Sequence, residues 1–271
     1  MALPTPSPDR TAVVTGASSG IGREIARRLA ARGLGLTLVA RREERLRELA
    51  GEVAAAHDVR VEVVAADLTD QGAREAVIAA VEAAGLVPAV LVNAAGLSTV
   101  GPVHRSDPAA ELTMLRTDVE ALAHLCSLAL PGMVERGTGA ILNVASTAAF
   151  QPMPGQAGYA ASKAFVVSYS QALRGELKGT GVTVTVLCPG PVKTEFAEAA
   201  GFDPDEAEAA LPSIMWLAAG DVAEAGVDGL DRGRAVVIPG VANRLGAVGA
   251  RLAPRSLLVP ILARQHPGLK G

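Results

Sequence analysis

The sequence predicts an α/β fold in which helices cover a buried parallel β-sheet. The chain has 271 residues and is 49% hydrophobic but 3% aromatic, so its core is built from Ala, Val and Leu, as in a sheet buried on both faces. A short β-rich run at 11–15 leads through a glycine-rich turn into a helix-like stretch at 23–32. The length lies within the range of one large domain, and we expect residues 1–271 to form a single domain.

The composition excludes several classes of function. A formal net charge of −3 supplies no basic field for nucleic acid. The two cysteines, Cys126 and Cys188, lie in apolar runs without a Cys-x-x-Cys pair, and we expect buried thiols in a reducing cytoplasm. The four histidines are scattered without metal-ligand spacing, so the sequence predicts no metal site.

The two ends of the chain are expected to be accessory segments. Residues 1–9 hold three prolines and no apolar core of signal-peptide length, which predicts a flexible leader. No run of about eighteen apolar residues occurs, so no transmembrane segment is expected. The tail, 243–271, alternates leucines and valines with arginines. Two interpretations stay open for it: peripheral contact with a membrane surface and, as the favoured one, packing against a subunit or the substrate pocket.

The glycine-rich turn after the first strand predicts a phosphate-binding site. Gly16, Gly20 and Gly22 let the backbone turn sharply and approach a diphosphate, while N–H groups at the helix N-terminus bind its negative charge. Their spacing is Gly-x-x-x-Gly-x-Gly rather than the commoner Gly-x-Gly-x-x-Gly. Three glycines can also merely punctuate a connection, but the strand before them and the helix after them favour the phosphate site.

The end of the second strand, 34–40, indicates which nucleotide binds. An acidic side chain there would accept hydrogen bonds from the ribose hydroxyls of NAD. This chain instead carries Ala40 followed by Arg41 and Arg42, whose guanidinium groups can pair with a ribose 2′-phosphate. We therefore expect NADP(H), with NAD(H) as the alternative. In the competing interpretation, the two arginines only begin the helix at 43–57 and interact with its glutamates.

Two further strands end in polar residues. The run 60–68 is predicted to be a strand that ends in Asp67, whose carboxylate would accept from an adenine amino group or, alternatively, cap the helix that follows. Within 89–96, a fourth strand ends at Asn93 and turns at Gly96. A glycine turn at this place leaves backbone room beside a ribose.

The run 146–163 is where we expect the chemistry. Tyr159 and Lys163 are four residues apart, which on a helix that opens at Tyr159 places phenol and ammonium on one face. A free tyrosine titrates near pH ~10, and a cation about 4–6 Å away favours its phenolate, so Lys163 is expected to lower the pKa of Tyr159. Ser146 follows the strand 140–144 and is placed to hold a substrate oxygen. The competing interpretation is a tyrosine at a helix start, a solvated lysine and a loop serine.

The remaining stretches complete the alternation of strands and helices. Apolar residues at helical spacing predict a long helix over 108–135 with Asp118 in its middle. The further expected elements are a strand at 182–187, a mobile helical flap over the substrate at 193–217, a helix at 222–230 and a last strand at 235–238.

As a set, these motifs resemble those of the classical short-chain dehydrogenases/reductases. The resemblance covers residues 11 to about 194, in the family's order and spacing, and implies a Rossmann-type fold. In that fold a doubly wound, three-layer arrangement holds about seven parallel strands in the order 3-2-1-4-5-6-7. It also implies a homodimer or homotetramer built on the helices that carry Asp118 and Tyr159. The residues that carry it are Thr15 to Gly22, Asp67, Asn93 to Gly96, Ser146, Tyr159 to Lys163 and Pro189-Gly190.

The resemblance further implies a role for each site residue. Tyr159 exchanges a proton with the substrate oxygen, Ser146 orients that oxygen, and Lys163 binds the nicotinamide ribose. Asp118 stands where the family usually has asparagine, whose backbone carbonyl holds a proton-carrying water; its carboxylate is expected to offset part of the Lys163 charge and to alter the pH optimum. The residues assigned to the cofactor are Gly16, Ser18, Ser19, Gly20, Ile21, Gly22, Arg41, Arg42, Asp67, Leu68, Asn93, Ala94, Gly96, Tyr159, Lys163, Pro189, Gly190, Val192 and Thr194.

The leading functional prediction is a cytoplasmic, NADP(H)-dependent reductase or alcohol dehydrogenase acting on an apolar or amphipathic small molecule. The alternative is a nucleotide-binding sensor or scaffold with little turnover, which Asp118 alone favours. A serine hydrolase is set aside because the chain lacks a Gly-x-Ser-x-Gly elbow and a suitable histidine. The apolar side chains expected to line the substrate pocket, or equally to pack in the core, are Phe150, Met153, Phe196, Phe202, Met215 and Trp216.

Overall fold

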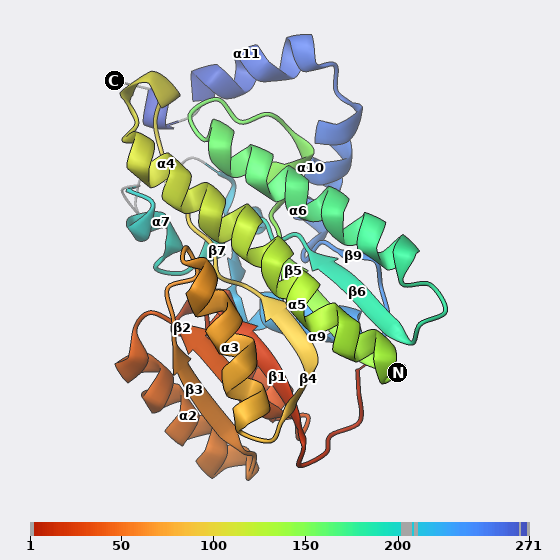
Figure 1. Ribbon diagram of the computed structural model, residues 1–271. Helices are drawn as coiled ribbons and strands as arrows, with labels where there is room; N and C mark the ends of the chain where they lie inside the picture. The colour runs from red at the N-terminus through yellow and green to blue at the C-terminus, as the bar shows by residue number, and fades with distance from the viewer. Residues whose placement is uncertain (1–2, 202–207, 209–210, 266, 270–271) are drawn as a thin grey trace.

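A computed structural model of the chain describes residues 3–201, 208, 211–265 and 267–269 and contains a seven-stranded parallel sheet (Figure 1). The strand order is β3-β2-β1-β4-β5-β6-β9, which confirms the predicted order with β9 as the seventh strand. Because the order reverses between β1 and β4, a crevice forms at the carboxyl ends of these strands. The strands are β1 (Arg10–Thr15), β2 (Gly35–Ala40), β3 (Val61–Ala65), β4 (Val87–Asn93), β5 (Gly139–Val144), β6 (Val182–Leu187) and β9 (Val236–Val237).

Two layers of helices cover the sheet, each over its own apolar core. Successive side chains of a strand point to opposite faces, so Ala12 and Val14 of β1 join one core and Val13 joins the other. Helix α1 packs along α9, although the two are far apart in the chain. The first layer holds α1 (Gly20–Ala30), α2 (Glu43–His57) and α9 (Ala219–Asp231); the second, in front of the sheet in Figure 1, holds α3 (Gln71–Ala83), α5 (Leu122–Glu135) and α6 (Ala157–Glu176).

The helix ends follow local chemistry. Helix α2 has the predicted bounds. Two glutamates in its first turn stabilise it by interacting with the positive end of the helix dipole. Asp58, in the left-handed conformation with φ 51°, ends the helix. Asp70 caps α3 by accepting a hydrogen bond from Ala73 N at 2.7 Å. Helix α1 begins at Gly20 rather than at residue 23, so part of the glycine-rich turn forms its first helical turn.

The predicted helix over 108–135 is continuous, but its middle is wound differently. Helix α4 (Pro108–Leu115) and helix α5 are joined by a π-helical segment, η2 (Arg116–Ala121). A π-helical turn holds more residues than an α-helical turn, so side chains after it point in a different direction from that expected of an unbroken α-helix. Asp118 lies inside this segment and is buried.

Helix α6 begins at Ala157, two residues before the predicted start at Tyr159. The expectation that the helix opens at Tyr159 is therefore wrong, because Gly158 is already helical. A Cβ at Gly158 would lie 2.5 Å from Met114 Cε and 2.6 Å from Glu111 Oε2, both on α4. The glycine thus lets two helices approach closely, and its place is inside the first turn of α6.

The segment predicted as a helical flap, 193–217, is only partly helical. It contains α7 (Phe196–Ala199) and a short 3₁₀ turn, η4 (Ser213–Met215). Its two ends pair as a small parallel sheet of β7 (Val192–Lys193) and β8 (Leu217–Ala218). Residues 202–207, 209 and 210 lie outside the described residues.

The tail forms two helices, α10 (Val241–Leu252) and α11 (Arg255–Gln265), and a 3₁₀ turn, η5 (Pro267–Leu269). Helix α10 packs on η3 (Thr147–Phe150), the 3₁₀ turn that follows Ser146. Another 3₁₀ turn, η1 (Val103–Arg105), precedes α4. At the other end, Leu3 N donates to Asp231 Oδ1 at 3.4 Å, whereas residues 1, 2, 266, 270 and 271 lie outside the described part. Within that part, no helix is long and apolar enough to span a bilayer.

Candidate active site

The carboxyl ends of the strands open into a cavity of about 640 Å³. The structure brings most of the predicted site residues together on its wall, and two of them, Asn93 and Asp118, lie behind it. The lining includes Gly16, Ser18, Ser19, Gly20, Ile21, Gly22, Arg41, Arg42, Asp67, Leu68, Ala94, Gly96, Ser146, Tyr159, Lys163, Pro189, Gly190, Val192 and Thr194.

The glycine-rich turn is packed so closely that side chains would not fit. Gly16 has φ +67°, and a Cβ there would lie 2.7 Å from Ala95 N. A Cβ at Gly22 would lie 2.4 Å from Gly16 O. The turn ends at the N-terminus of α1, on the cavity wall. Free N–H groups at a helix N-terminus fit a diphosphate, and the glycines let its oxygens approach them closely.

Thr15, to which the sequence assigned no role of its own, joins the two strands that flank the crevice. Its Oγ1 accepts hydrogen bonds from Ala94 N at 3.1 Å and Ala95 N at 3.2 Å and donates to Val92 O at 3.2 Å. The hydroxyl therefore fixes the turn after β4 against the end of β1, so that Gly16 and Gly96 lie on one wall of the cavity.

Asn93 does not reach the cavity with its side chain. The buried amide donates from Nδ2 to Asn143 Oδ1 at 2.9 Å, and Asn143 Nδ2 donates to Ser170 Oγ at 2.9 Å. This chain of hydrogen bonds joins β4, β5 and α6 inside the core. The predicted contact of Asn93 with the cofactor is therefore limited to the backbone that follows it at Ala94 and Gly96.

Arg42 lies beside the glycine-rich turn and also reaches the described part of 193–217, the stretch predicted as a flap and called the covering segment below. Its Nη2 donates to Ser18 Oγ at 3.1 Å and Ser19 Oγ at 2.9 Å, and its Nη1 donates to Glu195 Oε2 at 3.2 Å. Arg45, which sequence reasoning missed, donates to both carboxylate oxygens of Glu195 at 2.8 Å. Hydrogen bonds from Arg45, followed by those from Arg42, lower the pKa of Glu195 below its ordinary value.

Asp67 forms a turn of its own rather than a helix cap. Its Oδ1 accepts from Thr69 N at 3.0 Å and from Thr69 Oγ1 at 2.8 Å, as in an Asx-turn. The Thr69 backbone N–H, followed by the Thr69 hydroxyl, lowers the pKa of Asp67, with a smaller contribution from Arg41. Behind it, buried Arg74 donates to Leu68 O at 2.8 Å and so holds this part of the cavity wall.

The residues from 189 to 194 run across the cavity from Ser146 to the glycine-rich turn. Thr147 N donates to Pro189 O at 2.8 Å, which fixes the first end beside Ser146. At the other end, a Cβ at Gly20 would lie 3.3 Å from Thr194 Cγ2. The covering segment therefore begins in contact with the start of α1.

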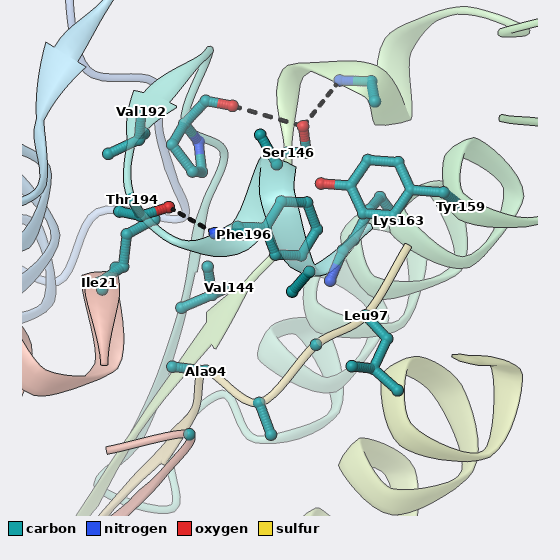
Figure 2. Close-up of a pocket in the computed structure, with 18 of the residues that line it drawn as sticks. Ile21, Ala94, Leu97, Val144, Ser146, Tyr159, Lys163, Val192, Thr194 and Phe196 are labelled. Carbon is teal, nitrogen blue, oxygen red and sulfur yellow. Dashed lines mark hydrogen bonds between the residues drawn. The ribbon is translucent and has the colours of Figure 1, made fainter. Parts of the chain in front are cut away.

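Ser146, Tyr159 and Lys163 face the same part of the cavity (Figure 2). The Tyr159 hydroxyl points toward Ser146, whose Oγ accepts from Ala148 N at 3.1 Å. Lys163 Nζ lies 5.5 Å from the centre of the Tyr159 ring, within cation–π range. On the other side, the ring of Phe196 lies 5.7 Å from that of Tyr159, centroid to centroid. The Tyr159 and Ser146 hydroxyls can therefore reach one substrate oxygen, with the Lys163 ammonium beside the phenol ring.

Lys163 and Asp118 form a buried ion pair. Lys163 Nζ lies 2.9 Å from Asp118 Oδ2, and Asp118 Oδ1 accepts a hydrogen bond from Leu97 N at 2.8 Å. Burial acts to lower the pKa of Lys163, but the Asp118 carboxylate and, to a smaller extent, Tyr159 outweigh it and raise that pKa above its usual range. Lys163 is therefore charged at neutral pH, as expected, and its nearest partner is Asp118.

The pKa of Tyr159 is raised rather than lowered. Burial is the largest influence and raises it, Lys163 and the Ser146 hydroxyl act to lower it, and Asp118 raises it again. The expectation that Lys163 would bring the phenol below its ordinary pKa is thus wrong for the protein by itself. The direction of the Lys163 effect is as expected, but burial together with the Asp118 charge exceeds it.

The part of the cavity beyond Tyr159 is mostly apolar. Phe150 does not line it but is buried in the core behind Ser146, and Phe202 lies outside the described residues. The apolar side chains that do line this part are Met153, Phe196, Leu211, Met215, Trp216 and Leu262, the last contributed by α11.

Neither cysteine lines the cavity. Cys126 and Cys188 are free and buried, and burial raises the pKa of each thiol to about 12. Both are therefore protonated at neutral pH, which confirms the prediction of buried thiols.

Comparisons with known proteins give the site its context. Residues 10–204 match the family model described as short chain dehydrogenase. Sulfoacetaldehyde reductase 2 of Chromohalobacter salexigens is 41% identical over 215 residues, which cover 78% of this chain and 84% of that protein. A short-chain dehydrogenase from Sphingobium yanoikuyae, solved with NADPH, is 36% identical with a TM-score of 0.79, covering 89% of this chain and 93% of the other. The 3-ketoacyl-(acyl-carrier-protein) reductase from Brucella melitensis, solved with NADH, is 27% identical with a TM-score of 0.77, covering 86% and 98%.

Proposed function

Because the chain belongs to the short-chain dehydrogenase family and is an oxidoreductase of CH–OH and C=O groups, we propose that it is an NADP(H)-dependent reductase of apolar carbonyl compounds. Tyr159 is its acid and base. One observation carries the proposal: the Tyr159 hydroxyl, Ser146 and Lys163 face the same cavity into which the glycine-rich turn opens.

The wall of the cavity fits a dinucleotide in three places: at its diphosphate, at its adenine and at the ribose next to the nicotinamide. The diphosphate would lie on the N–H groups at the start of α1, beside Gly16 and Gly22, which carry no side chain. Asp67 and Leu68 would lie against the adenine, and the ribose next to the nicotinamide would lie near Lys163. When bound, the nicotinamide supplies or accepts the hydride.

The cavity also offers two guanidinium groups for a ribose 2′-phosphate. Arg41 and Arg42 follow β2 directly and line the cavity, and Arg42 already donates to Ser18 and Ser19. Guanidinium groups bind phosphate oxygens with two parallel hydrogen bonds. An acidic side chain that would bind the free ribose hydroxyls is absent at Ala40. These features support NADP(H) over NAD(H).

Ser146, Tyr159 and Lys163 have separate roles in the transfer of the proton. Ser146 donates its hydroxyl hydrogen bond to the substrate oxygen and so fixes the carbonyl beside Tyr159. In reduction, the Tyr159 phenol gives its proton to that oxygen as negative charge develops there, and in oxidation the phenolate removes it. The Lys163 ammonium stabilises the phenolate electrostatically. Phe196 and the rest of the covering segment exclude water from this part of the cavity.

The lining supports an apolar substrate rather than a small anion. Among the described lining residues beyond Tyr159, the side chains are mainly those of Met, Leu, Phe and Trp. Among the described residues of the lining, Lys163 is paired with Asp118 and Arg42 faces the opposite end beside the glycine-rich turn, so these residues offer a sulfonate no unpaired cation beyond Tyr159. For a series of straight-chain ketones, each added methylene is expected to raise kcat/KM by up to about fourfold, from about 0.8 kcal/mol per buried CH₂. A higher kcat/KM for sulfoacetaldehyde than for every ketone would contradict this substrate class.

Replacing Tyr159 by phenylalanine tests the proposed role. Tyr159→Phe is expected to lower kcat for NADPH-dependent carbonyl reduction by about 10²–10⁴-fold, because general acid catalysis is lost. NADPH binding, followed by fluorescence titration, should change little. The matched control is Tyr169→Phe on the same helix, since the Tyr169 hydroxyl donates to Ala123 O at 3.4 Å, away from the cavity. Full activity of Tyr159→Phe would remove Tyr159 from the mechanism.

A second function, a nucleotide-binding sensor with little turnover, is favoured by one observation. The Lys163 charge is shared with Asp118 at 2.9 Å, which weakens its pull on Tyr159. The same assay separates the two functions. Binding of NADPH without its oxidation by any compound of a broad carbonyl panel would support the sensor.

We also propose a homodimer or homotetramer built on η2–α5 and α6. Helix α6 presents Phe165, which stacks on Tyr169 at 5.3 Å between ring centroids and is partly exposed. Apolar side chains on the neighbouring helices, Leu112, Leu115 and Val134, are also exposed. Light scattering coupled to gel filtration should give a mass of two or four chains, and Phe165→Glu should reduce it. A monomeric mass for the unmodified chain would contradict the proposal.

A further inference from the structure

Helix α10 carries an apolar stripe that no described residue covers. Its exposed apolar residues follow one another at intervals of four, three and four, which places them on one side of the helix. The opposite side packs on the protein through the buried Asn243 and Ala247. The exposed fractions along the stripe are 72% for Val241, 68% for Leu245, 49% for Val248 and 80% for Leu252.

Helix α11 adds two exposed apolar side chains directly after this stripe. Leu257 and Ile261, four residues apart, are 64% and 51% exposed. In Figure 1, α10 and α11 lie next to each other at the same end of the molecule, above α6. The same helix places Leu262 on the wall of the cavity. The exposed apolar surface of the tail and the apolar part of the cavity therefore share one element.

The tail is basic throughout. After Asp231 the sequence holds no Asp or Glu, whereas the chain as a whole carries a net charge of −3. Within the described part of the chain, the arginines of α10 and α11 have no carboxylate partner, and two of them face Phe150: Arg251 lies over its ring at 5.5 Å and Arg255 donates to its carbonyl oxygen at 3.2 Å. The basic residues after Asp231 are Arg232, Arg234, Arg244, Arg251, Arg255, Arg264 and Lys270.

We propose that α10 and α11 form a docking surface for a phospholipid bilayer that carries anionic headgroups. A helix with an apolar stripe and flanking arginines lies in the plane of such a surface, with its apolar side below the headgroups and its cations among them. Arginines without a carboxylate partner can pair with the phosphate groups of the lipid headgroups. A second copy of the chain, seated on the same face by two-fold symmetry, would instead oppose arginine to arginine.

Docking through this face would place the α11 side of the cavity next to lipid. Leu262 and Leu257 lie on one helix, so the apolar part of the cavity and the lipid-facing surface are separated by the thickness of that helix. Apolar carbonyl compounds concentrate in a bilayer, and such a position would bring the site close to their source. This link to the substrate rests on the proposed function, whereas docking itself does not.

Sedimentation of the full chain with vesicles tests the docking surface. One set of vesicles is phosphatidylcholine, and the other is an equimolar mixture of phosphatidylcholine and phosphatidylglycerol. We expect the bound fraction to be at least tenfold greater on the mixed vesicles and to fall as salt is added, because surface charges are screened. Lack of binding to the mixed vesicles, or equal binding to both sets, would overturn the proposal.

Paired variants separate the stripe and the arginines from general surface effects. Leu245→Glu combined with Leu252→Glu, and separately Arg244→Glu, should each reduce binding to the mixed vesicles at least fivefold. The matched controls are Val103→Glu in η1, where the side chain is 57% exposed, and Arg47→Glu on α2; both should bind as the unmodified chain does. Carbonyl reduction in vesicle-free buffer reports folding of each variant independently.

The same variants distinguish the bilayer from a second copy of the chain. If Leu245→Glu with Leu252→Glu lowers the mass measured by light scattering without vesicles, the stripe is a subunit interface and the proposal is wrong. An unchanged mass together with lost vesicle binding supports it. Because Arg244→Glu changes one exposed side chain, it keeps the test valid even if the double variant does not fold.

Discussion

Lys163 and Asp118 form an ion pair inside the protein, with 2.9 Å between Nζ and Oδ2 and with side chains that are 6% and 0% exposed. Tyr159 lies on the other side of the ammonium, 5.5 Å from Nζ to the ring centre. One lysine charge therefore acts on two neighbours, a carboxylate in direct contact and a phenol farther away. The balance between them determines at which pH the phenol gives up its proton.

Asp118→Asn is expected to shift the pH dependence of catalysis. The Asp118 charge raises the pKa of Tyr159, so its removal lowers that pKa and the phenolate forms at lower pH. Alcohol oxidation, which needs the phenolate, should therefore reach its plateau at lower pH, and carbonyl reduction, which needs the phenol, should decline at lower pH. Profiles of kcat/KM against pH in both directions measure the shift. The control is Glu120→Gln in the same π-helical segment; an unchanged profile for Asp118→Asn would mean that the carboxylate does not act on Tyr159.

Asp118→Ala is expected to destabilise the protein by about 3–5 kcal/mol at neutral pH, because it leaves the Lys163 ammonium buried without its partner. Urea unfolding measures the difference. Asp118→Leu combined with Lys163→Met should recover part of the loss, since it removes both charges together. A loss below about 1 kcal/mol for Asp118→Ala would show that water or another group solvates the ammonium.

The free energy of unfolding is expected to fall as the pH rises above ~10, the ordinary pKa of lysine and tyrosine. Asp118 raises the pKa of Lys163 and burial raises the pKa of Tyr159, so the folded protein holds both protons more tightly than the unfolded chain. The stability that they contribute is complete below pH ~10 and is lost as the pH rises through the folded-state values. Urea unfolding between neutral and alkaline pH measures the decline. Asp118→Asn should show a smaller decline, and an equal one would assign the effect to other groups.

Arg42→Gln is expected to weaken NADPH binding by about 10-fold or more, because charge-assisted hydrogen bonds contribute roughly 1.5–3 kcal/mol. NADH binding should change little, since NADH lacks the 2′-phosphate. Titration of both nucleotides against the variant measures the difference. Equal losses for NADPH and NADH would mean that Arg42 supports the glycine-rich turn through Ser18 and Ser19 instead of reading the phosphate.

Glu195→Gln is expected to tighten NADPH binding by about two- to fivefold, the range of exposed ion pairs. The Glu195 carboxylate accepts hydrogen bonds from Arg42 and Arg45, which a 2′-phosphate would otherwise engage. The matched control is Glu208→Gln, which removes the carboxylate that accepts from Lys193 Nζ at 2.6 Å in the same covering segment. Weaker NADPH binding by Glu195→Gln would instead show that the carboxylate positions the two arginines.

The sheet and its order follow from patterns that are local in the sequence. Each strand is a short apolar run, and some helix ends are marked by an acidic residue, as at Asp58 and Asp70. The site residues at strand ends could be predicted for the same reason, because parallel strands bring their carboxyl ends to one edge. This is why Ser146 and the glycine-rich turn, far apart in the chain, were expected in one cavity.

The features that sequence reasoning missed depend on contacts between distant elements. Gly158 resembles a loop residue until Met114 and Glu111 of α4 are seen against it. The Asn93 amide could face the cavity or the core, and only Asn143 on the neighbouring strand decides between them. The pairing of Arg45 with Glu195 joins residues 150 positions apart, and no periodic pattern connects them. The π-helical winding around Asp118 was missed for a different reason: over six residues, the spacing of apolar side chains in the sequence does not separate a π-helix from an α-helix.

The packing of α1 on α9 has a consequence for synthesis of the chain. Arg32, in the turn directly after α1, donates to Asp228 of α9, a residue 196 positions later. At translation rates of roughly 5–20 residues per second, the ribosome finishes α9 about 10–40 s after α1. Throughout that interval the nascent chain presents the uncovered apolar side of α1, and it is then that chaperones would bind it most readily.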